Sequence, residues 1–175
     1  MAPFGHAHGA ALSGVGIMML LTVGSQMQFD RLVKAVDAWA IDNPSVRIFA
    51  QIGKTDYRPQ AMEWVTLLGP EEYRKRFDEA ELIISHAGMG TVISAADHGK
   101  RLLVMPRREI LSETRNDHQV ATAKWLPGHF GIRVAMDENE LTQALEHWQD
   151  IAPCSSEDSD ARNDLLAAIR QFVNG

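Results

Sequence analysis

The sequence predicts an α/β fold in which a parallel β-sheet is covered by helices on both faces. Apolar segments of strand length alternate along the chain with segments whose apolar residues recur at helical spacing. The strand segments are continuously apolar, which is typical of parallel strands that are buried on both faces. Several of them end in glycine or polar residues, where a parallel sheet binds its ligands.

The first half of the chain predicts three strands and two helices. Strands are expected over residues 17–23, 46–52 and 64–68, and the first two are each followed by a glycine. A helix is expected over residues 29–41, because its apolar residues follow helical spacing. A second helix begins at Pro70, since proline and two glutamates in the first turn favour a helix start.

The second half continues the alternation with shorter segments. The strands expected here are residues 82–85, 102–105 and 132–135, and the helices expected are 91–98, 117–126 and 138–149. A final amphipathic helix carries its apolar side chains on one face, at Leu165, Leu166, Ile169, Phe172 and Val173. The connection over residues 106–116 is long for this fold class, and long loops in compact domains are often functional.

The length and composition indicate one compact domain in a reducing compartment. We expect residues 15–175 to form this domain and residues 1–14 to be a flexible extension, with His6 and His8 too few to bind a metal. The net charge of −6 argues against nucleic-acid or anionic-membrane binding, and no apolar run is long enough to span a membrane. The single cysteine, Cys154, lies in a polar stretch expected to be an exposed loop without a function.

The junction after residues 82–85 has the composition of an anion-binding helix start. His86 and Ala87 lead into Gly88, Met89 and Gly90, and Thr91 follows. A helix N-terminus presents free backbone N–H groups, and glycines there let a phosphate approach the backbone closely. The alternative is a tight turn that needs glycine for positive φ angles. The motif alone leaves both interpretations open.

A second polar cluster begins the helix after the long loop. One of Asn116 and Asp117 is explained as a helix N-cap. His118 and Gln119 follow immediately and are not explained by capping. Amide, imidazole and carboxylate groups bind sugar hydroxyls, and Glu109 in the same loop is expected to join them.

Several common enzyme classes lack their motifs in this sequence. There is no P-loop, no dinucleotide-binding glycine motif, no nucleophile elbow and no cluster of cysteine and histidine ligands. A diphosphate held by the backbone and the helix dipole beside a polyhydroxylated group indicates a nucleotide sugar. We therefore expect a nucleotide-sugar site at the carboxyl edge of the sheet.

These motifs resemble the donor-binding half of glycosyltransferase family 28. The resemblance rests on HAGMGT at residues 86–91, VMPRRE at 104–109, NDHQ at 116–119 and VGSQMQFDRLVKAVD at 23–37. It covers residues 17–126 well and the C-terminal helices loosely. The last stretch is similar to the one-domain members that act as catalytic subunits of two-subunit transferases, including those of exopolysaccharide synthesis. The resemblance implies a Rossmann-like domain that is the C-terminal half of a GT-B fold.

The resemblance also implies the reaction and its participants. It implies a UDP-sugar donor (N-acetylglucosamine or another hexose) as substrate, a lipid-linked saccharide acceptor and a membrane-associated partner chain that binds the acceptor. It implies cytoplasmic, peripheral membrane localisation, and inverting chemistry without a cofactor or metal. The general base is expected on the partner, and the isolated chain is expected to self-associate through its unpartnered cleft face. The C-terminal helix is expected either to dock on the partner or to cover the domain's own sheet.

The residues implied by the resemblance lie in three segments. His86, Glu109 and His118 are expected to be catalytic. The donor is expected to contact Gly24, Ser25, His86, Ala87, Gly88, Met89, Gly90, Thr91, Arg107, Glu109, Asn116, Asp117, His118 and Gln119. Gly24 and Ser25 would line the cleft toward the acceptor, and Arg107, Arg108 or His86 would assist the leaving group.

One residue departs from the family pattern. Many members carry a glutamate in the helix after the glycine loop, where it binds the ribose hydroxyls, and Ser94 stands at that position here. Serine retains a hydrogen-bonding hydroxyl but lacks the charge. This departure leaves a second function open, a non-catalytic nucleotide-sugar-binding or regulatory protein with the same fold.

Overall fold

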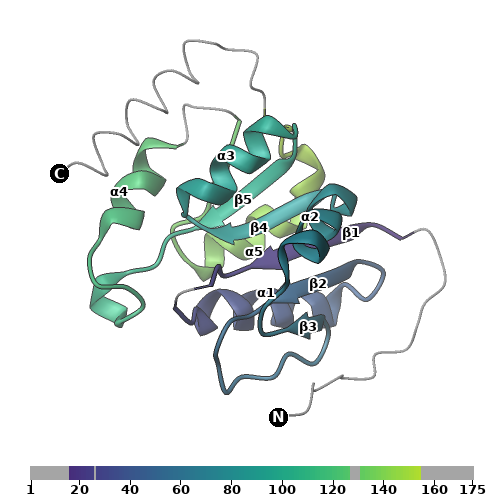
Figure 1. Ribbon diagram of the computed structural model, residues 1–175, viewed down its shortest axis with the longest axis horizontal. Helices are drawn as coiled ribbons and strands as arrows, with labels where there is room; N and C mark the ends of the chain where they lie inside the picture. The colour runs from purple at the N-terminus through teal and green to yellow at the C-terminus, as the bar shows by residue number, and fades with distance from the viewer. Residues whose placement is uncertain (1–15, 26, 127–130, 155–175) are drawn as a thin grey trace.

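Six parallel strands form the centre of the molecule in the order β3-β2-β1-β4-β5-β6 (Figure 1). The computed structural model describes residues 16–25, 27–126 and 131–154. The strands are β1 (Met18–Thr22), β2 (Arg47–Gln51), β3 (Glu63–Val65), β4 (Leu82–His86), β5 (Arg101–Met105) and β6 (Arg133–Val134). Every pair of neighbouring strands is parallel, which confirms the predicted sheet.

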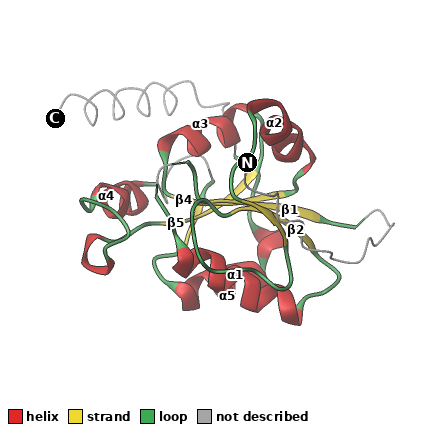
Figure 2. Ribbon diagram, turned by 60° about the horizontal axis from the view of Figure 1, so that its bottom comes forward, coloured by secondary structure: helices red, strands yellow, loops and turns green. Residues whose placement is uncertain are grey.

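Helices cover both faces of this sheet (Figure 2). They are α1 (Asp30–Asp42), α2 (Pro70–Glu79), α3 (Met89–Asp97), α4 (His118–Trp125) and α5 (Glu138–Glu146), with 3-10 turns at Glu109–Leu111 and Trp148–Asp150. In Figure 2, α1 and α5 lie below the sheet, and α2 and α3 lie above it. The fold is therefore Rossmann-like, as predicted.

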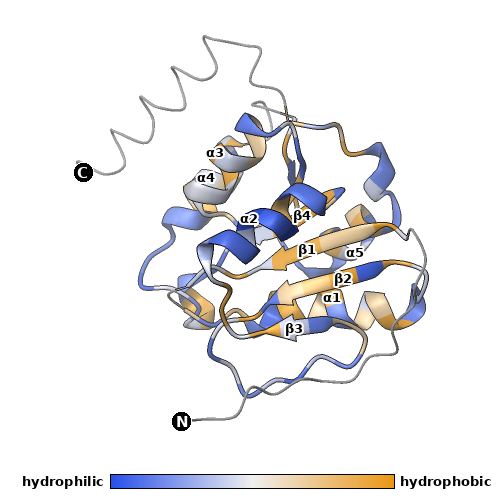
Figure 3. Ribbon diagram, turned by 45° about the vertical axis from the view of Figure 1, so that its right-hand side comes forward, coloured by the Kyte–Doolittle hydropathy of each residue, from blue (hydrophilic) through white to orange (hydrophobic). Residues whose placement is uncertain are grey.

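The two faces bury separate hydrophobic cores because side chains of a strand alternate between its faces. In β1, Met19 and Leu21 belong to the core under α1 and α5, whereas Met18 and Leu20 belong to the core under α2 and α3. All five residues of β1 are buried. Strands β1 and β2 are accordingly mostly apolar in Figure 3, while most residues of α2 are hydrophilic.

Most predicted elements agree with the structure to within two residues at each end, and two were expected to continue three residues too far. The third strand was expected over residues 64–68, but pairing with β2 ends at Val65 and leaves Leu67 62% exposed in a loop. The helix expected over residues 138–149 ends at Glu146, and a 3-10 turn follows. Pairing with β2 decides the end of the strand, and apolar patterning alone does not reveal it.

Cys154 is buried, so the expected exposed loop is wrong at this residue. The Cys154 N–H donates to the Lys100 carbonyl at 2.9 Å, and the preceding Pro153 forms an antiparallel bridge with Arg101 at the start of β5. This pairing turns the thiol into the core under α2 and α3. Burial raises its pKa to about 11, which keeps the thiol protonated at neutral pH.

The expected extension at residues 1–14 and the expected amphipathic helix near the C-terminus lie outside the described residues. Within the described ranges, no helix has both the length and the apolar character that crossing a bilayer requires.

The strand order reverses between β1 and β4, and in open α/β sheets ligands bind near such a reversal. From β1 the chain proceeds outward to β2 and β3, and then returns to β4 on the other side of β1. In such sheets the loops leaving the two central strands diverge to opposite faces and open a crevice at their carboxyl ends. Here those loops are the one from β1 to α1 and the one from β4 to α3.

A buried carboxylate anchors the loop between β2 and β3 to α1. Asp37 is 1% exposed and accepts hydrogen bonds from the Tyr57 hydroxyl at 2.6 Å, the Gln60 N–H at 3.0 Å and the Ala61 N–H at 2.9 Å. Lys34 Nζ on α1 also lies 5.4 Å from the centre of the Tyr57 ring in this loop.

Replacing this carboxylate should destabilise the domain. We expect Asp37→Ala to lower the free energy of unfolding by about 3 kcal/mol, because three donors lose a charged acceptor. The matched control is Asp42→Ala on the exposed side of the same helix, which should change it by less than about 0.5 kcal/mol. Urea denaturation of both variants measures this difference, and equal effects would contradict the anchoring role of Asp37.

Candidate functional site

A pocket of about 510 Å³ lies at the carboxyl ends of β1 and β2, between α2 and α3. Its volume is in the range of small-ligand sites. The residues that line it are Thr22, Gly24, Ser25, Gln51, Leu67, Leu68, Pro70, Tyr73, Arg74, Phe77, Asp78, Thr91, Ser94 and His98. Of the residues predicted for the site, Gly24, Ser25 and Thr91 line this pocket.

One face of each flanking helix forms a wall of the pocket. On α3, the lining residues Thr91 and Ser94 are three positions apart, and His98 follows four later at the C-cap. Residues at this spacing share a helix face. The position that departs from the family pattern, Ser94, therefore faces the same pocket as Thr91. His98 Nδ1 also donates to the Ser94 carbonyl at 2.8 Å, at the C-terminal end of the helix.

Gln51 fixes the floor of the pocket by joining two loops. Its Nε2 donates to the Gly24 carbonyl at 3.3 Å and to Thr22 Oγ1 at 3.4 Å. Its Oε1 accepts from the Leu68 N–H at 2.9 Å. Gln51 is 4% exposed, so these bonds satisfy a buried amide. The loops after β1 and β3 are thereby held at a fixed separation.

The two glycines nearest β1 and β4 make room for His86. Gly24 has φ +77°, and a Cβ atom at this position would lie 2.9 Å from His86 Cε1. A Cβ atom at Gly88 would overlap His86 Nε2. The imidazole is therefore packed between the two turns that border the crevice. For Gly24 the positive φ angle is an additional requirement for glycine.

The environment of His86 keeps its imidazole neutral. Burial and the positive charge of Arg107 lower the pKa of His86 to about 4, and a hydrogen bond with the Thr22 backbone opposes this shift. A neutral imidazole offers one hydrogen-bond donor and one acceptor. At neutral pH it does not act as a cationic acid.

The start of α3 presents backbone to solvent at the rim of the pocket. Gly88 is the N-cap of α3, and the N–H groups of its first turn have no partner within the helix. Gly90 is exposed, and a Cβ atom there would meet no heavy atom within 4 Å. An anion can therefore approach these N–H groups closely, and the helix dipole favours it.

The pocket side chains combine hydroxyl groups with a few charges. Burial raises the pKa of Tyr73, while hydrogen bonds with Thr91 and Thr22 oppose this shift, so its hydroxyl stays protonated at neutral pH. Arg74 supplies a cation and Asp78 a carboxylate. Hydroxyl and carboxylate groups bind sugar hydroxyls, and the cation and the helix start bind phosphate.

Arg107, in the loop after β5, was expected to contact the donor, but in the structure its guanidinium binds backbone carbonyls. Arg107 is 4% exposed, and its guanidinium donates to the carbonyls of Val23, at 2.7 Å, and Met27. It also lies 5.1 Å from the centre of the Phe29 ring. Burial lowers its pKa to about 10, so it remains charged at neutral pH. In this structure the guanidinium holds the loop between β1 and α1.

Five further predicted residues form a separate polar cluster at the start of α4, namely Glu109, Asn116, Asp117, His118 and Gln119. The Gln119 side chain accepts from the Arg107 N–H at 3.2 Å. Asp117 accepts from the Glu109 N–H at 2.9 Å, and Asn116 accepts from the His118 N–H at 3.2 Å. Of these, Glu109, Asn116, Asp117 and His118 are exposed. None of the five is among the described residues lining the pocket between α2 and α3.

Ala87 and Met89, the other predicted contacts, face the core on the α2 side of the sheet. Ala87 is 3% exposed, and Met89 packs partly buried against the same core. Their backbone, rather than their side chains, borders the helix start. Within the described part of the chain, no three histidine, cysteine, aspartate or glutamate side chains gather as metal ligands.

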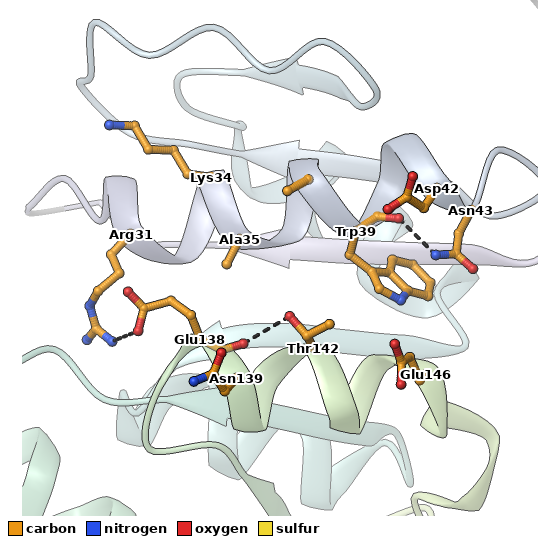
Figure 4. Close-up of a pocket in the computed structure, with 11 residues that line it drawn as sticks. Arg31, Lys34, Ala35, Trp39, Asp42, Asn43, Glu138, Asn139, Thr142 and Glu146 are labelled. Atoms are coloured by element: carbon orange, nitrogen blue, oxygen red, sulfur yellow. Dashed lines mark hydrogen bonds and ion pairs between the residues drawn. The ribbon is translucent and has the colours of Figure 1, made fainter.

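A larger groove of about 690 Å³ runs between α1 and α5 (Figure 4). Arg31 and Glu138 form an ion pair of 3.3 Å at one end, and Trp39 and Glu146 lie toward the other. Its walls are flanks of α1 and α5, including their first turns at Arg31, Glu138 and Asn139, and no strand end lines it. It therefore lacks the strand ends at which an open α/β sheet binds its ligands.

A parallel sheet with a pocket at the carboxyl ends of its strands is the arrangement in which open α/β domains bind their ligands. The glycosyltransferase family 28 C-terminal domain matches residues 18–163, which is most of the chain. The chain belongs to this family, and its fold is the C-terminal half of a GT-B glycosyltransferase. No curated protein sequence matches the chain.

Solved structures share this fold at low sequence identity. The chain is similar to the glycosyltransferase of kitacinnamycin (TM-score 0.60, 19% identity, 91% of this chain and 40% of that chain). It is also similar to Acinetobacter baumannii MurG (TM-score 0.55, 19% identity, 94% and 50%) and to ALG13 (TM-score 0.58, 16% identity, 81% and 90%). The chain thus spans half or less of the first two proteins and nearly all of ALG13.

Sequence reasoning missed six polar residues of the pocket, namely Thr22, Gln51, Tyr73, Arg74, Asp78 and His98. Gln51 lies just before a glycine at the carboxyl end of a strand, and that pattern was a usable signal. Tyr73, Arg74 and Asp78 lie on α2, whose charged sequence is equally compatible with a solvated surface helix.

The depressed pKa of His86 makes stability depend on pH. Its folded pKa of about 4 lies below the usual 6.5, so the unfolded chain binds the proton more readily. The stabilisation is complete above pH 6.5 and is lost as the pH falls toward 4. The loss amounts to about 3 kcal/mol.

Urea denaturation between pH 7 and pH 4, with His86→Gln as the comparison, measures this effect. The variant cannot bind the proton, so its free energy of unfolding should fall less over this range than that of the wild-type protein. Parallel declines in the two proteins would contradict the assignment of a buried neutral imidazole.

Proposed function

We propose that this protein is the catalytic, donor-binding component of a glycosyltransferase that uses a UDP-sugar. The observation that supports this proposal most is the pocket between α2 and α3. The accessible start of α3 lies beside the hydroxyl-bearing side chains that line this pocket. Family membership supplies the reaction class. The transferred group is N-acetylglucosamine or another hexose, and the product is a polysaccharide or glycolipid precursor.

The donor diphosphate binds at the start of α3 in this proposal. The free N–H groups of the first turn and the Thr91 hydroxyl donate to it, and Arg74 adds a positive charge from α2. The nucleoside lies in the pocket, where Ser94 and Asp78 offer partners for ribose hydroxyls. Ser94 lacks the negative charge of the family glutamate, and in this proposal the Asp78 carboxylate supplies a negative charge in the same pocket.

The reaction is a single displacement that inverts the anomeric carbon. The acceptor hydroxyl attacks this carbon, the bond to the diphosphate oxygen breaks, and UDP leaves with the bonding electron pair. Negative charge grows on the leaving oxygen, and the α3 dipole and N–H groups stabilise it. Because Arg107 already binds the Val23 and Met27 carbonyls, we assign this stabilisation to α3 and Arg74 rather than to Arg107.

The acceptor site and the general base belong to a partner in this proposal. The chain spans 40% and 50% of two glycosyltransferases of the same fold, and nearly all of ALG13. A lipid-linked saccharide acceptor would be bound by a membrane-associated chain at the cytoplasmic face. Glu109 and His118 are exposed on the loop and helix after β5, where they would meet the donor sugar or the partner once the cleft is formed.

A non-catalytic nucleotide-sugar-binding protein is the second candidate. Ser94 lines the pocket in place of the family glutamate, and this is the observation that favours it. Both candidates bind UDP compounds, and only the transferase turns them over.

Substitutions of Gly88 and Gly90, at the start of α3, should separate effects on stability from effects on UDP binding. We expect Gly90→Ala to raise the free energy of unfolding by about 0.5–1 kcal/mol, because alanine favours the helix and meets no neighbour. The same methyl group obstructs the anion, so UDP affinity should fall about tenfold, which corresponds to one charge-assisted hydrogen bond.

Gly88→Ala is the matched control, because its methyl group would overlap His86 and should destabilise the protein. Thermal unfolding and UDP titration of both variants measure the two effects. Unchanged UDP affinity in Gly90→Ala would contradict diphosphate binding at the start of α3.

A thermal-shift titration with UDP, GDP, TDP and a panel of UDP-sugars tests the donor. Ligand binding to the folded state raises its stability in proportion to RT ln(1 + [L]/Kd). We expect a shift with UDP compounds only, and then transfer from the best UDP-sugar to lipid when membranes that contain the partner are added. Donor binding without transfer under those conditions would favour the non-catalytic candidate, and the absence of any shift would contradict both.

A further inference from the structure

Two adjacent aliphatic side chains project from the loop between β5 and α4. Ile110 is 87% exposed and Leu111 is 50% exposed, in the 3-10 turn Glu109–Leu111. We call these two side chains the apolar tip. Large aliphatic groups in such positions lose the stabilisation of burial, and clusters of them mark contact surfaces.

The apolar tip lies at the same edge of the sheet as the pocket. Five large hydrophobic residues are exposed in the described part of the chain, and besides the tip they are Met27, Ile41 and Leu67. Met27 and Leu67 follow the carboxyl ends of β1 and β3, as the tip follows β5. Only Ile41, near the end of α1, lies elsewhere. The exposed apolar residues therefore border the cleft side of the domain.

The turn that carries the tip is fixed by hydrogen bonds at its base. The N–H groups of Leu111 and Glu113 donate to the Arg108 carbonyl at 3.2 and 3.3 Å. The Ser112 N–H donates to Glu109 at 2.8 Å, with Ser112 in the left-handed region at φ 56°. The tip is thus presented in one conformation, and a binding partner would order little of it.

A nearly buried ion pair joins this base to α1. Arg31 contacts Glu113 through two parallel hydrogen bonds of 2.7 and 2.9 Å, and the two side chains are only 12% and 11% exposed. Glu113 also accepts from the Arg108 N–H at 2.9 Å, and Arg31 donates to the Pro106 carbonyl at 2.9 Å. Paired charges of low exposure hold a loop rigidly, because breaking one bond leaves a buried charge without its partner.

The charges around the tip disfavour an anionic membrane as its occupant. Glu109 and Asp117 are exposed carboxylates beside the tip, and Arg115 is the exposed cation in the same loop. Binding to anionic lipid requires a cluster of basic residues, and the chain as a whole carries a net charge of −6. A protein surface with an apolar recess fits this chemistry.

We infer that the apolar tip is the anchor through which a second protein domain, the acceptor-binding one, docks over the cleft. This inference rests on the proposed function. The size of the occupant follows from the comparisons, because MurG and the kitacinnamycin glycosyltransferase contain at least as much chain again as this domain matches. An apolar centre that is buried on binding and ringed by polar groups is common in such interfaces.

The experiment first identifies the occupant in the cells that produce the protein. A benzophenone amino acid replaces Ile110 in the full chain, and the matched control carries it at Ile41, which is also exposed but lies away from the cleft side. We expect light to crosslink position 110, and not position 41, to a second polypeptide.

That polypeptide is then purified and titrated against the wild-type chain, Ile110→Asp and Ile41→Asp. We expect Ile110→Asp to weaken binding by about tenfold or more, and Ile41→Asp to leave it unchanged. The UDP thermal shift should be the same in all three chains, because neither residue lines the pocket.

Four results would overturn the inference. They are crosslinks from position 110 to phospholipid, crosslinks to another copy of this chain, no crosslink at all, and equal affinity of Ile110→Asp and the wild-type chain for the captured polypeptide. Failure of the proposed function is distinguishable, since it would appear as the absence of a UDP thermal shift in the wild-type chain while the docking measurement remains valid.

Discussion

The packing of one imidazole between two turns determines the shape of the site. His86 ends β4, and its ring fills the space between Gly24 after β1 and Gly88 before α3. Because the strand order reverses between β1 and β4, these two turns are the borders of the crevice. Their separation is therefore set by the thickness of a ring, and any side chain at either glycine would change it. The open start of α3 lies directly beyond this contact.

Two arginines connect the same region to the rest of the fold. Arg107, from the loop after β5, binds the Val23 and Met27 carbonyls and so fixes the loop between β1 and α1. Arg31, from α1, binds Glu113 and so fixes the loop after β5. Each loop is thus held by a cation from the neighbouring element. These two cations position backbone, and in the proposed function α3 and Arg74 supply the positive field for the diphosphate.

The sheet and most helices could be predicted because their signals are local. Continuously apolar strands and helically spaced apolar residues are visible in the sequence, and glycines at strand ends indicate the cleft edge. The partners of Arg107 and Cys154 could not be predicted, because each depends on a contact with a residue distant in sequence, Val23 and Lys100 respectively. The wall formed by α2 was hidden for the same reason. Its charged sequence does not reveal that Tyr73 and Asp78 face a pocket rather than solvent.

The binding of a diphosphate at the start of α3 is the central claim, and backbone NMR tests it most directly. UDP is titrated into the ¹⁵N-labelled full chain, and the amide shifts of all assigned residues are followed. The account predicts that the largest shifts belong to Met89, Gly90 and Thr91, with further shifts along the pocket faces of α2 and α3. Saturable shifts confined to other surfaces, such as the groove between α1 and α5, would contradict it.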